Sequence, residues 1–170
     1  MIGLPARNEA APYYYKYIDR VTSNDVIQVL ETQLQQMSRF FQNISEEKSL
    51  HRYAPEKWSI RQVLNHINDS ERVFLFRAFW FARGFPAQLP SFEQNVAADA
   101  GEADEISWTR HIEEFVTVRQ ATLSFFRNLP QAAWLRTGIA SDNPFTVRSL
   151  AYIIAGHATH HSTIIQEQYL

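Results

Sequence analysis

Residues 58–72, WSIRQVLNHINDSER, determine how the rest of the chain is interpreted. Ser59 followed by Gln62 is a capping box, in which each side chain satisfies a backbone N–H at the start of a helix. Apolar and small residues then recur at spacings of three and four, which is the period of a helix with one buried face. The segment therefore predicts a helix from Ser59 to about Arg83, just before a glycine and a proline.

Three other segments have the same period, so the sequence contains four long amphipathic helices. The additional ranges are Asn24 to Ile44, Ser107 to about Asn128, and a segment capped by Thr146 that ends near Gln168. No stretch alternates polar and apolar residues over a useful length, and Gly138 to Pro144 is expected to be a turn-rich loop. Four helices of roughly 20 residues predict an all-α four-helix bundle.

The segments outside these helices give weaker signals. Residues 1–22 are expected to form an extended or loosely ordered arm that carries a tyrosine cluster between two prolines. The connection from Gly84 to Ile106 is long enough to cross the bundle, so a simple up-and-down order of helices is not required. Within it, Ser91-Phe92-Glu93-Gln94 repeats the capping-box pattern and predicts a short helix. With no inter-domain linker, residues 1–170 are interpreted as one domain.

Composition excludes several classes of function. Hydrophobic residues form 45% of the chain, which is enough for a sizeable core, and the net charge of −2 offers no electrostatic basis for binding nucleic acid. The longest nearly apolar stretch, Val73 to Ala82, is about half of the ~20 residues needed to cross a bilayer. The absence of cysteine excludes disulfides, thiolate metal sites and cysteine nucleophiles. We therefore expect a soluble cytoplasmic protein that binds neither nucleic acid nor membrane.

Histidines in the predicted second and fourth helices indicate a metal site. His157 and His161 lie four residues apart, and at about 100° per residue their directions differ by only about 40°. Both fall inside an apolar stripe between Ile154 and Ile164, where unengaged ring nitrogens are costly. His66 occupies the equivalent inward stripe of the second helix. Three neutral imidazoles from two helices would form an open site with vacant positions for water or substrate.

Spacing alone leaves other assignments open. A buried histidine is usually a hydrogen-bonded core residue, and two histidines four residues apart in a helix can arise by chance. His111 on the third helix can also face inward, and His160, about 60° from His157, can replace His161. His51 lies in a connecting segment and is most simply a surface residue.

Two acidic residues that follow His66 are candidates for a supporting role. Asp69 and Glu71 are placed to orient an imidazole or to bind a water on the metal. An equally good interpretation is that they pair with Arg72 or Arg148 on the helix surface.

Two arginines interrupt apolar stripes on separate helices. Arg77 and Arg119 are each able to bind an anionic group of a substrate. The favoured interpretation is an internal salt bridge to Glu71 or Glu113. The tyrosines of the arm can fold over the site, although packing on the outside of the bundle is the simpler account.

The segment from Trp58 to Arg72 resembles the KWS-x-(K/R)-(E/Q)-(V/I)-L-x-H-(L/I)-x-D-x-E motif of the DinB/YfiT-like superfamily. The connection after this helix and the GHATHH stretch at residues 156–161 resemble the same superfamily, so the similarity covers most of residues 12–168. It implies a bundle whose metal ligands are the histidine of the second helix and the paired histidines of the fourth. Carried over, these are His66, His157 and His161.

The same resemblance implies a function. The superfamily resembles S-transferases that use low-molecular-weight thiols, and the related maleylpyruvate isomerase. One divalent transition metal, Zn, Ni or Fe, would lower the pKa of a bound thiol or water, which then attacks a small electrophile. The missing cysteines fit this interpretation, since the thiol would come from a cosubstrate, and a hydrolase is a variant of the same site.

A non-catalytic bundle that binds metal in a stress response is the alternative to an enzyme. A catalytic site keeps an open coordination position, whereas a structural site is closed by a fourth protein ligand. The inner stripes offer no obvious fourth histidine or cysteine, which favours the enzyme. The many aromatic residues also make a homodimer an expectation.

Overall fold

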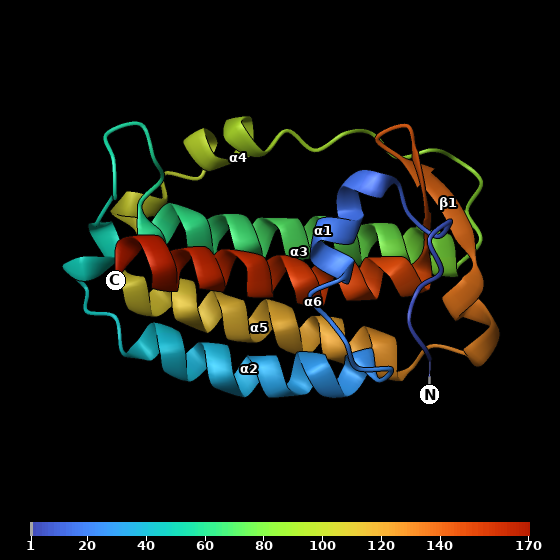
Figure 1. Ribbon diagram of the computed structural model, residues 1–170. Helices are drawn as coiled ribbons and strands as arrows, with labels where there is room; N and C mark the ends of the chain where they lie inside the picture. The colour runs from blue at the N-terminus through green and yellow to red at the C-terminus, as the bar shows by residue number, and fades with distance from the viewer. Residues whose placement is uncertain (1) are drawn as a thin grey trace.

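The computed structural model describes residues 2–170 and consists mainly of four long helices that lie side by side (Figure 1). They are α2 (Val26–Gln42), α3 (Ile60–Ala82), α5 (Trp108–Arg127) and α6 (Val147–Ile164). One turn of π-helix, Ile165–Tyr169, extends α6. The predicted four-helix bundle is confirmed, and the predicted helices lie where the sequence placed them. Among residues 2–170, no helix has the length and apolar character needed to cross a membrane.

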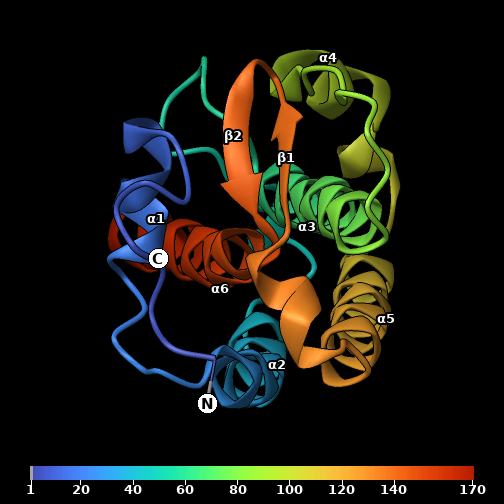
Figure 2. The same cartoon turned by 90° about the vertical axis from the view of Figure 1, so that its right-hand side faces the viewer.

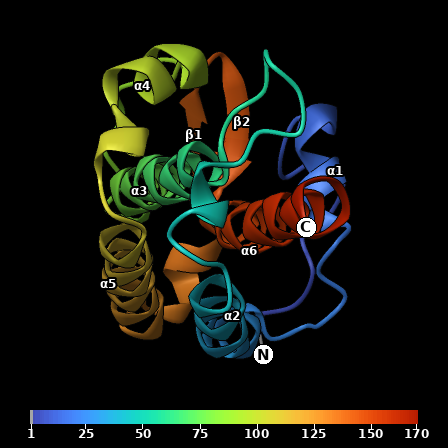
Figure 3. The same ribbon diagram turned by 90° about the vertical axis from the view of Figure 1, so that its left-hand side faces the viewer.

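The helices do not follow a simple up-and-down order. Both α3 and α2 pack against α5 and α6, so that α2 and α3 lie on a diagonal of the bundle (Figures 2 and 3). Helices α3 and α5 run in the same direction, and residues 83–107 return along the outside of the bundle between them (Figure 1). This connection carries α4 (Gln94–Ala100) and a 3-10 turn, η3 (Ala103–Glu105). The long crossing that the sequence allowed is therefore present.

Capping residues define where the long helices begin. The backbone N–H of Gln62 donates to Ser59 Oγ at 3.1 Å, and the N–H of Ser59 donates to Gln62 Oε1 at 3.0 Å, which confirms the predicted capping box. Thr146 caps α6 as expected. The short connecting helix begins later than predicted, because Glu93, and not Ser91, accepts the N–H bond that starts α4.

The loop expected between α5 and α6 is a two-stranded hairpin, so that prediction was wrong. Strands β1 (Thr137–Ala140) and β2 (Asn143–Thr146) pair antiparallel and cover one end of the bundle (Figure 2). Ser141 and Asp142 both have positive φ, as the two central residues of a type I′ turn require. At Gly138, an added Cβ would lie 1.9 Å from the Phe81 ring, so the hairpin packs directly on α3.

The N-terminal arm is ordered, contrary to the expectation for residues 1–22. Its described part forms a 3-10 turn, η1 (Pro12–Tyr14), and the short helix α1 (Tyr15–Ile18), which packs against α6. Glu9 anchors it, since its carboxylate accepts hydrogen bonds from Thr146 Oγ1 at 2.7 Å and Arg148 Nε at 2.9 Å. Burial alone would raise the pKa of Glu9, but these hydrogen bonds and that of the Ala6 N–H outweigh it and lower the pKa.

One buried polar network contacts all four long helices. Arg119 on α5 donates through Nε and Nη2 to the two carboxylate oxygens of Glu71 on α3, both at 2.8 Å. Its Nη1 donates to Gln33 Oε1 on α2 at 2.9 Å. The amide of Gln33 then donates to the carbonyl of Ala155 and to Thr159 Oγ1, both on α6. The internal salt bridge predicted for Arg119 is confirmed.

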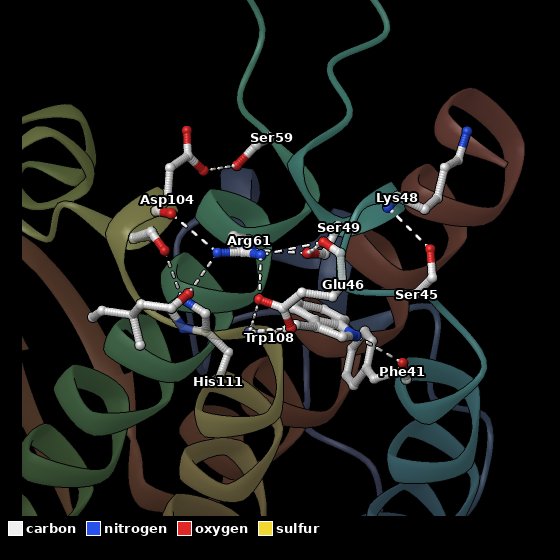
Figure 4. A network of polar contacts seen from close by, with 12 residues as sticks. Phe41, Ser45, Glu46, Lys48, Ser49, Ser59, Arg61, Asp104, Trp108 and His111 are labelled. Carbon is white, nitrogen blue, oxygen red and sulfur yellow. Dashed lines mark hydrogen bonds and ion pairs between the residues drawn. The ribbon is translucent and has the colours of Figure 1, made fainter.

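A second network, at the end of the bundle away from the hairpin, centres on Arg61, which the sequence did not single out (Figure 4). An arginine has five N–H groups, and all of those of Arg61 have acceptors. Nε donates to Ser49 Oγ, Nη1 to the carbonyls of Asp104 and Ile106, and Nη2 to the carbonyl and carboxylate of Glu46. Arg61 thereby joins the loop after α2, the start of α3 and the segment before α5.

Replacing Arg119 by alanine tests the network that spans the four helices. Arg119→Ala leaves the Glu71 carboxylate buried without a partner and should lower the free energy of unfolding by about 3–5 kcal/mol. The control is Arg127→Ala, which removes an exposed ion pair with Glu31 and should cost less than about 1 kcal/mol. Denaturant unfolding in the presence of a chelator measures both. A loss for Arg119→Ala no larger than for the control would contradict this account.

Candidate metal centre

Three histidines converge at the interface between α3 and α6. His66 Nε2 lies 3.1 Å from His157 Nε2, and one ring nitrogen from each of His66, His157 and His161 lies within 4.8 Å of the other two. His66 and His157 are each only 5% exposed. The spacing of four residues on α6 and the antiparallel packing of α3 explain why the rings meet. The structure therefore brings together the three residues that the sequence singled out.

This donor set fits a divalent transition metal. Zinc–imidazole bonds are about 2.0–2.1 Å long, which places neighbouring ligand nitrogens roughly 3 Å apart. The 3.1 Å between His66 Nε2 and His157 Nε2 is close to this value, and a ring nitrogen of His161 lies within 4.8 Å of both. Burial lowers the pKa of His66 to about 4. Burial, followed in size by the neighbouring His66 and His160, lowers the pKa of His161 to about 3. Burial also lowers the pKa of His157 well below its ordinary value. All three rings are therefore neutral near pH 7, the form that binds a metal.

The surroundings of His66 favour one orientation of its ring. Ser70, one turn further along α3, places its hydroxyl 3.4 Å from His66 Nδ1. This contact leaves Nε2 directed toward His157. Two aromatic rings pack against these imidazoles. The ring centroids of Trp58 and His66 are 5.0 Å apart, and those of Phe74 and His157 are 6.0 Å apart. Sequence reasoning missed this role of Ser70, although its position one helical turn after His66 was an available signal.

The other histidines lie outside this cluster. His160 faces the N-terminal arm, whereas His161 faces His66, with 4.8 Å between the ring centroids of that pair. His111 is buried, but its Nε2 lies 2.8 Å from the carbonyl of Ala103, so it is a core residue that holds the end of the long connection (Figure 4). His51 is exposed.

The acidic candidates are engaged away from the imidazoles. Asp69 accepts from Asn65 at 3.0 Å and from Arg72 at 3.2 Å, which matches the surface-pairing interpretation. Glu71 is held by Arg119 in the buried network. Within residues 2–170, the metal-type cluster contains these three imidazoles and no carboxylate. In the described part of the chain, no fourth histidine and no Asp or Glu joins the cluster.

Arg77 differs from what the sequence favoured. The expected internal salt bridge is not formed by this residue: its Nη2 donates to the carbonyl of Pro90 at 3.1 Å and to Ser141 Oγ at 2.9 Å. These contacts attach the long connection and the hairpin turn to α3. The partner of an arginine in an apolar stripe depends on the packing of distant segments, which explains why Arg77 and Arg119 could not be distinguished by sequence.

The arm folds over the histidines, the less simple of the two alternatives that the sequence offered. The Tyr17 ring lies 5.1 Å from His157 and 5.4 Å from His160, centroid to centroid. The approach is close because Gly156 has no side chain, and a Cβ there would lie 1.9 Å from the carbonyl oxygen of Tyr17. Burial raises the pKa of Tyr17 well above its ordinary value, so its hydroxyl stays protonated near pH 7.

Two pockets reach the cluster from different sides. One, of about 260 Å³, lies between the arm, α3 and the start of α4, and His66 and His157 form part of its wall together with Arg77. The other, of about 280 Å³, is lined by His161, Trp58 and residues near the C-terminus. A small molecule can therefore approach the imidazoles without rearrangement of the bundle.

Comparisons with known proteins agree with this architecture. The family model described as the DinB superfamily matches residues 29–165. The structure of YfiT from Bacillus subtilis, described as "a probable metal-dependent hydrolase with an unusual four-helix bundle topology", superposes with a TM-score of 0.74 and 15% sequence identity, covering 96% of this chain and 90% of that one. At that identity the likeness concerns the fold. No curated protein matches the chain.

The Gly156→Ala variant tests the close approach of the arm. Helix propensity alone would stabilise the protein by about 1 kcal/mol. The new methyl group instead displaces Tyr17, so we expect faster tryptic cleavage after Lys16 and Arg20 and a protein no more stable than the wild type. Limited proteolysis and thermal unfolding measure the two effects. A stabilised variant with unchanged cleavage would show that the arm does not pack on Gly156.

Proposed function

The chain belongs to the DinB superfamily, and on this basis we propose that it binds one divalent transition metal at His66, His157 and His161 and activates water or a small thiol for attack on a small electrophile. The observation that carries the proposal is the convergence of three neutral imidazoles, two buried and one half-buried, beside a pocket. When bound, such an ion lowers the pKa of a water or thiol that reaches an open coordination position. Imidazole ligands suit Zn²⁺, Ni²⁺ or Fe²⁺.

The residues of this chain have separate roles in that reaction. Ser70 and Trp58 hold the His66 ring in place, while burial keeps all three imidazoles neutral. Tyr17 and the rest of the arm limit access of water to His157 from one side. The pocket along α3 would hold the electrophile beside His66 and His157.

The access that the pockets give to the three histidines supports an enzyme over a metal-binding bundle without turnover. A structural zinc site is closed by four protein ligands, whereas the cluster in residues 2–170 has three and adjoins two pockets. Separate pockets at His157 and at His161 suit a reaction with two reactants, such as a thiol and an electrophile. The description of YfiT supports the variant in which water is the nucleophile. The small-molecule partner and the homodimer remain predictions.

Elemental analysis of untagged protein is the first test. We expect about one equivalent of transition metal per wild-type chain and none for His157→Ala or His66→Ala, since two imidazoles hold an ion far less tightly than three. Added metal should raise the melting temperature of the wild type but not of His66→Ala. The same metal content in wild type and in His66→Ala would refute the ligand assignment.

The His160→Ala variant is the matched control on the same helix. His160 neighbours His161 but lies outside the cluster, so this variant should keep its metal and its response to added metal. Loss of metal here, with retention in His161→Ala, would mean that the wrong neighbouring histidine was assigned.

Activity is tested with a panel of small esters, amides and alkylating electrophiles, each with and without a small thiol. We expect turnover by the metal-loaded wild type that a chelator abolishes and that His66→Ala lacks. Products formed without added thiol indicate water as nucleophile, and products that require thiol indicate transfer. A fully loaded protein that turns over none of them in either condition would support the non-catalytic alternative.

A further inference from the structure

Arg77 carries a buried positive charge that no carboxylate balances. Its side chain is only 3% exposed, and within residues 2–170 no carboxylate oxygen lies within 4.0 Å of it. The other arginines buried to this degree differ: Arg61 pairs with Glu46, and Arg119 pairs with Glu71. A buried cation without a counter-charge is costly, and burial accordingly lowers the pKa of Arg77.

Part of the hydrogen-bonding capacity of Arg77 is also unused. Of its five N–H groups, the two on Nη2 are directed to Pro90 and Ser141. The Tyr14 hydroxyl is a further hydrogen-bonding neighbour of the guanidinium, and Arg77 lines the same pocket as His66 and His157. Two N–H groups therefore remain available to a ligand in this pocket.

The pocket follows α3 from the histidines to Arg77. His66, Ser70, Phe74 and Arg77 all line it and follow one another at spacings of four, four and three, which places them on one helix face. Arg77 comes eleven residues after His66, so their Cα atoms are about 16 Å apart along the helix axis. A ligand that contacts both ends must therefore be extended.

Aromatic rings surround Arg77: Tyr14 and Phe74 line the pocket, and the buried Phe145 packs beside them. The guanidinium carbon lies 5.9 Å from the centre of the Phe74 ring and 6.0 Å from that of Phe145. Tyr14 packs edge-on against both rings, at 6.4 and 4.9 Å. Weakly polar walls strengthen the attraction between the arginine and an anion because they exclude water.

We propose that Arg77 binds the carboxylate of an extended small substrate whose reactive group reaches His66 and His157. This inference rests on the proposed function, because it assigns the reacting end of the substrate to the candidate metal centre. A carboxylate fits better than a phosphate, since Arg77 is the single cation among the described residues that line the pocket, and Glu93 at the rim adds a negative charge. A phosphate dianion carries two negative charges, and Arg77 would balance only one of them.

The test uses metal-free, full-length protein, so that a carboxylate cannot bind to an ion. The probes are 4-phenylbutyrate and its neutral analogue 4-phenylbutyramide, titrated in an isothermal calorimeter with chelator present. Hydrogen bonds to a charged group are worth about 1.5–3 kcal/mol, so the wild type should bind the acid about tenfold or more tightly than the amide. Arg77→Gln should abolish this preference, and Arg83→Gln, an exposed arginine at the end of α3, should retain it.

A second variant separates ligand binding from the structural contacts of Arg77. Ser141→Ala removes one acceptor of Nη2 but leaves the charge and the free donors, so it should keep the preference for the acid. Equal binding of acid and amide by the wild type would overturn the proposal, as would loss of the preference in Ser141→Ala to the extent seen in Arg77→Gln. Tighter binding of 3-phenylpropylphosphonate than of 4-phenylbutyrate would overturn the carboxylate assignment.

The outcome is separable from that of the metal experiment. If the acid preference holds in metal-free protein but the wild type takes up no metal, the anion-binding pocket stands and the proposed function fails. If metal is bound and the acid is not preferred, only the role of Arg77 is wrong.

Discussion

The buried network of Glu71, Arg119 and Gln33 is the interaction on which the placement of the four helices depends. It contacts all four long helices, and its three side chains are buried, so each polar group in it needs a partner. Its members also adjoin the histidines. Glu71 lies five residues after His66 on α3, and Gln33 contacts α6 on either side of His157, at Ala155 and Thr159. The satisfied network therefore sets the registers of α3 and α6 that bring the imidazoles together.

The long helices and the pair of histidines four residues apart were predictable because their signals are local, whereas the full set of three histidines came from the resemblance to the DinB/YfiT-like superfamily. Ser59 and Gln62 mark a helix start within four residues, and a period of three to four residues identifies a buried face over twenty. The arm and the hairpin lacked such signals. They are held by contacts between residues far apart in sequence, such as Glu9 with Arg148, and the close approach at Gly156. The hairpin turn uses Ser141 and Asp142 in place of Asn-Gly, so its sequence resembled a loop.

The buried arginines show where sequence reasoning about the site stopped. Arg119 and Arg77 both interrupt apolar stripes, and the period of a helix cannot distinguish them. What separates them is the segment that each one faces: α3 supplies the carboxylate of Glu71 to Arg119, whereas the long connection and the hairpin offer Arg77 only a carbonyl and a hydroxyl. Helix periodicity likewise could not decide between His160 and His161, since that choice depends on where α3 places His66.

The candidate centre and the pocket beside it are built from different parts of the chain, and this division bears on specificity. The three imidazoles come from two long helices whose positions are fixed by buried contacts. The pocket adds walls from the arm, the start of α4 and the hairpin turn, which lie outside the four-helix core. Changes in those segments can alter which molecule reaches the histidines without moving the histidines themselves. The cluster of three histidines therefore indicates the kind of chemistry, whereas Arg77 and the outer segments would determine which substrate binds.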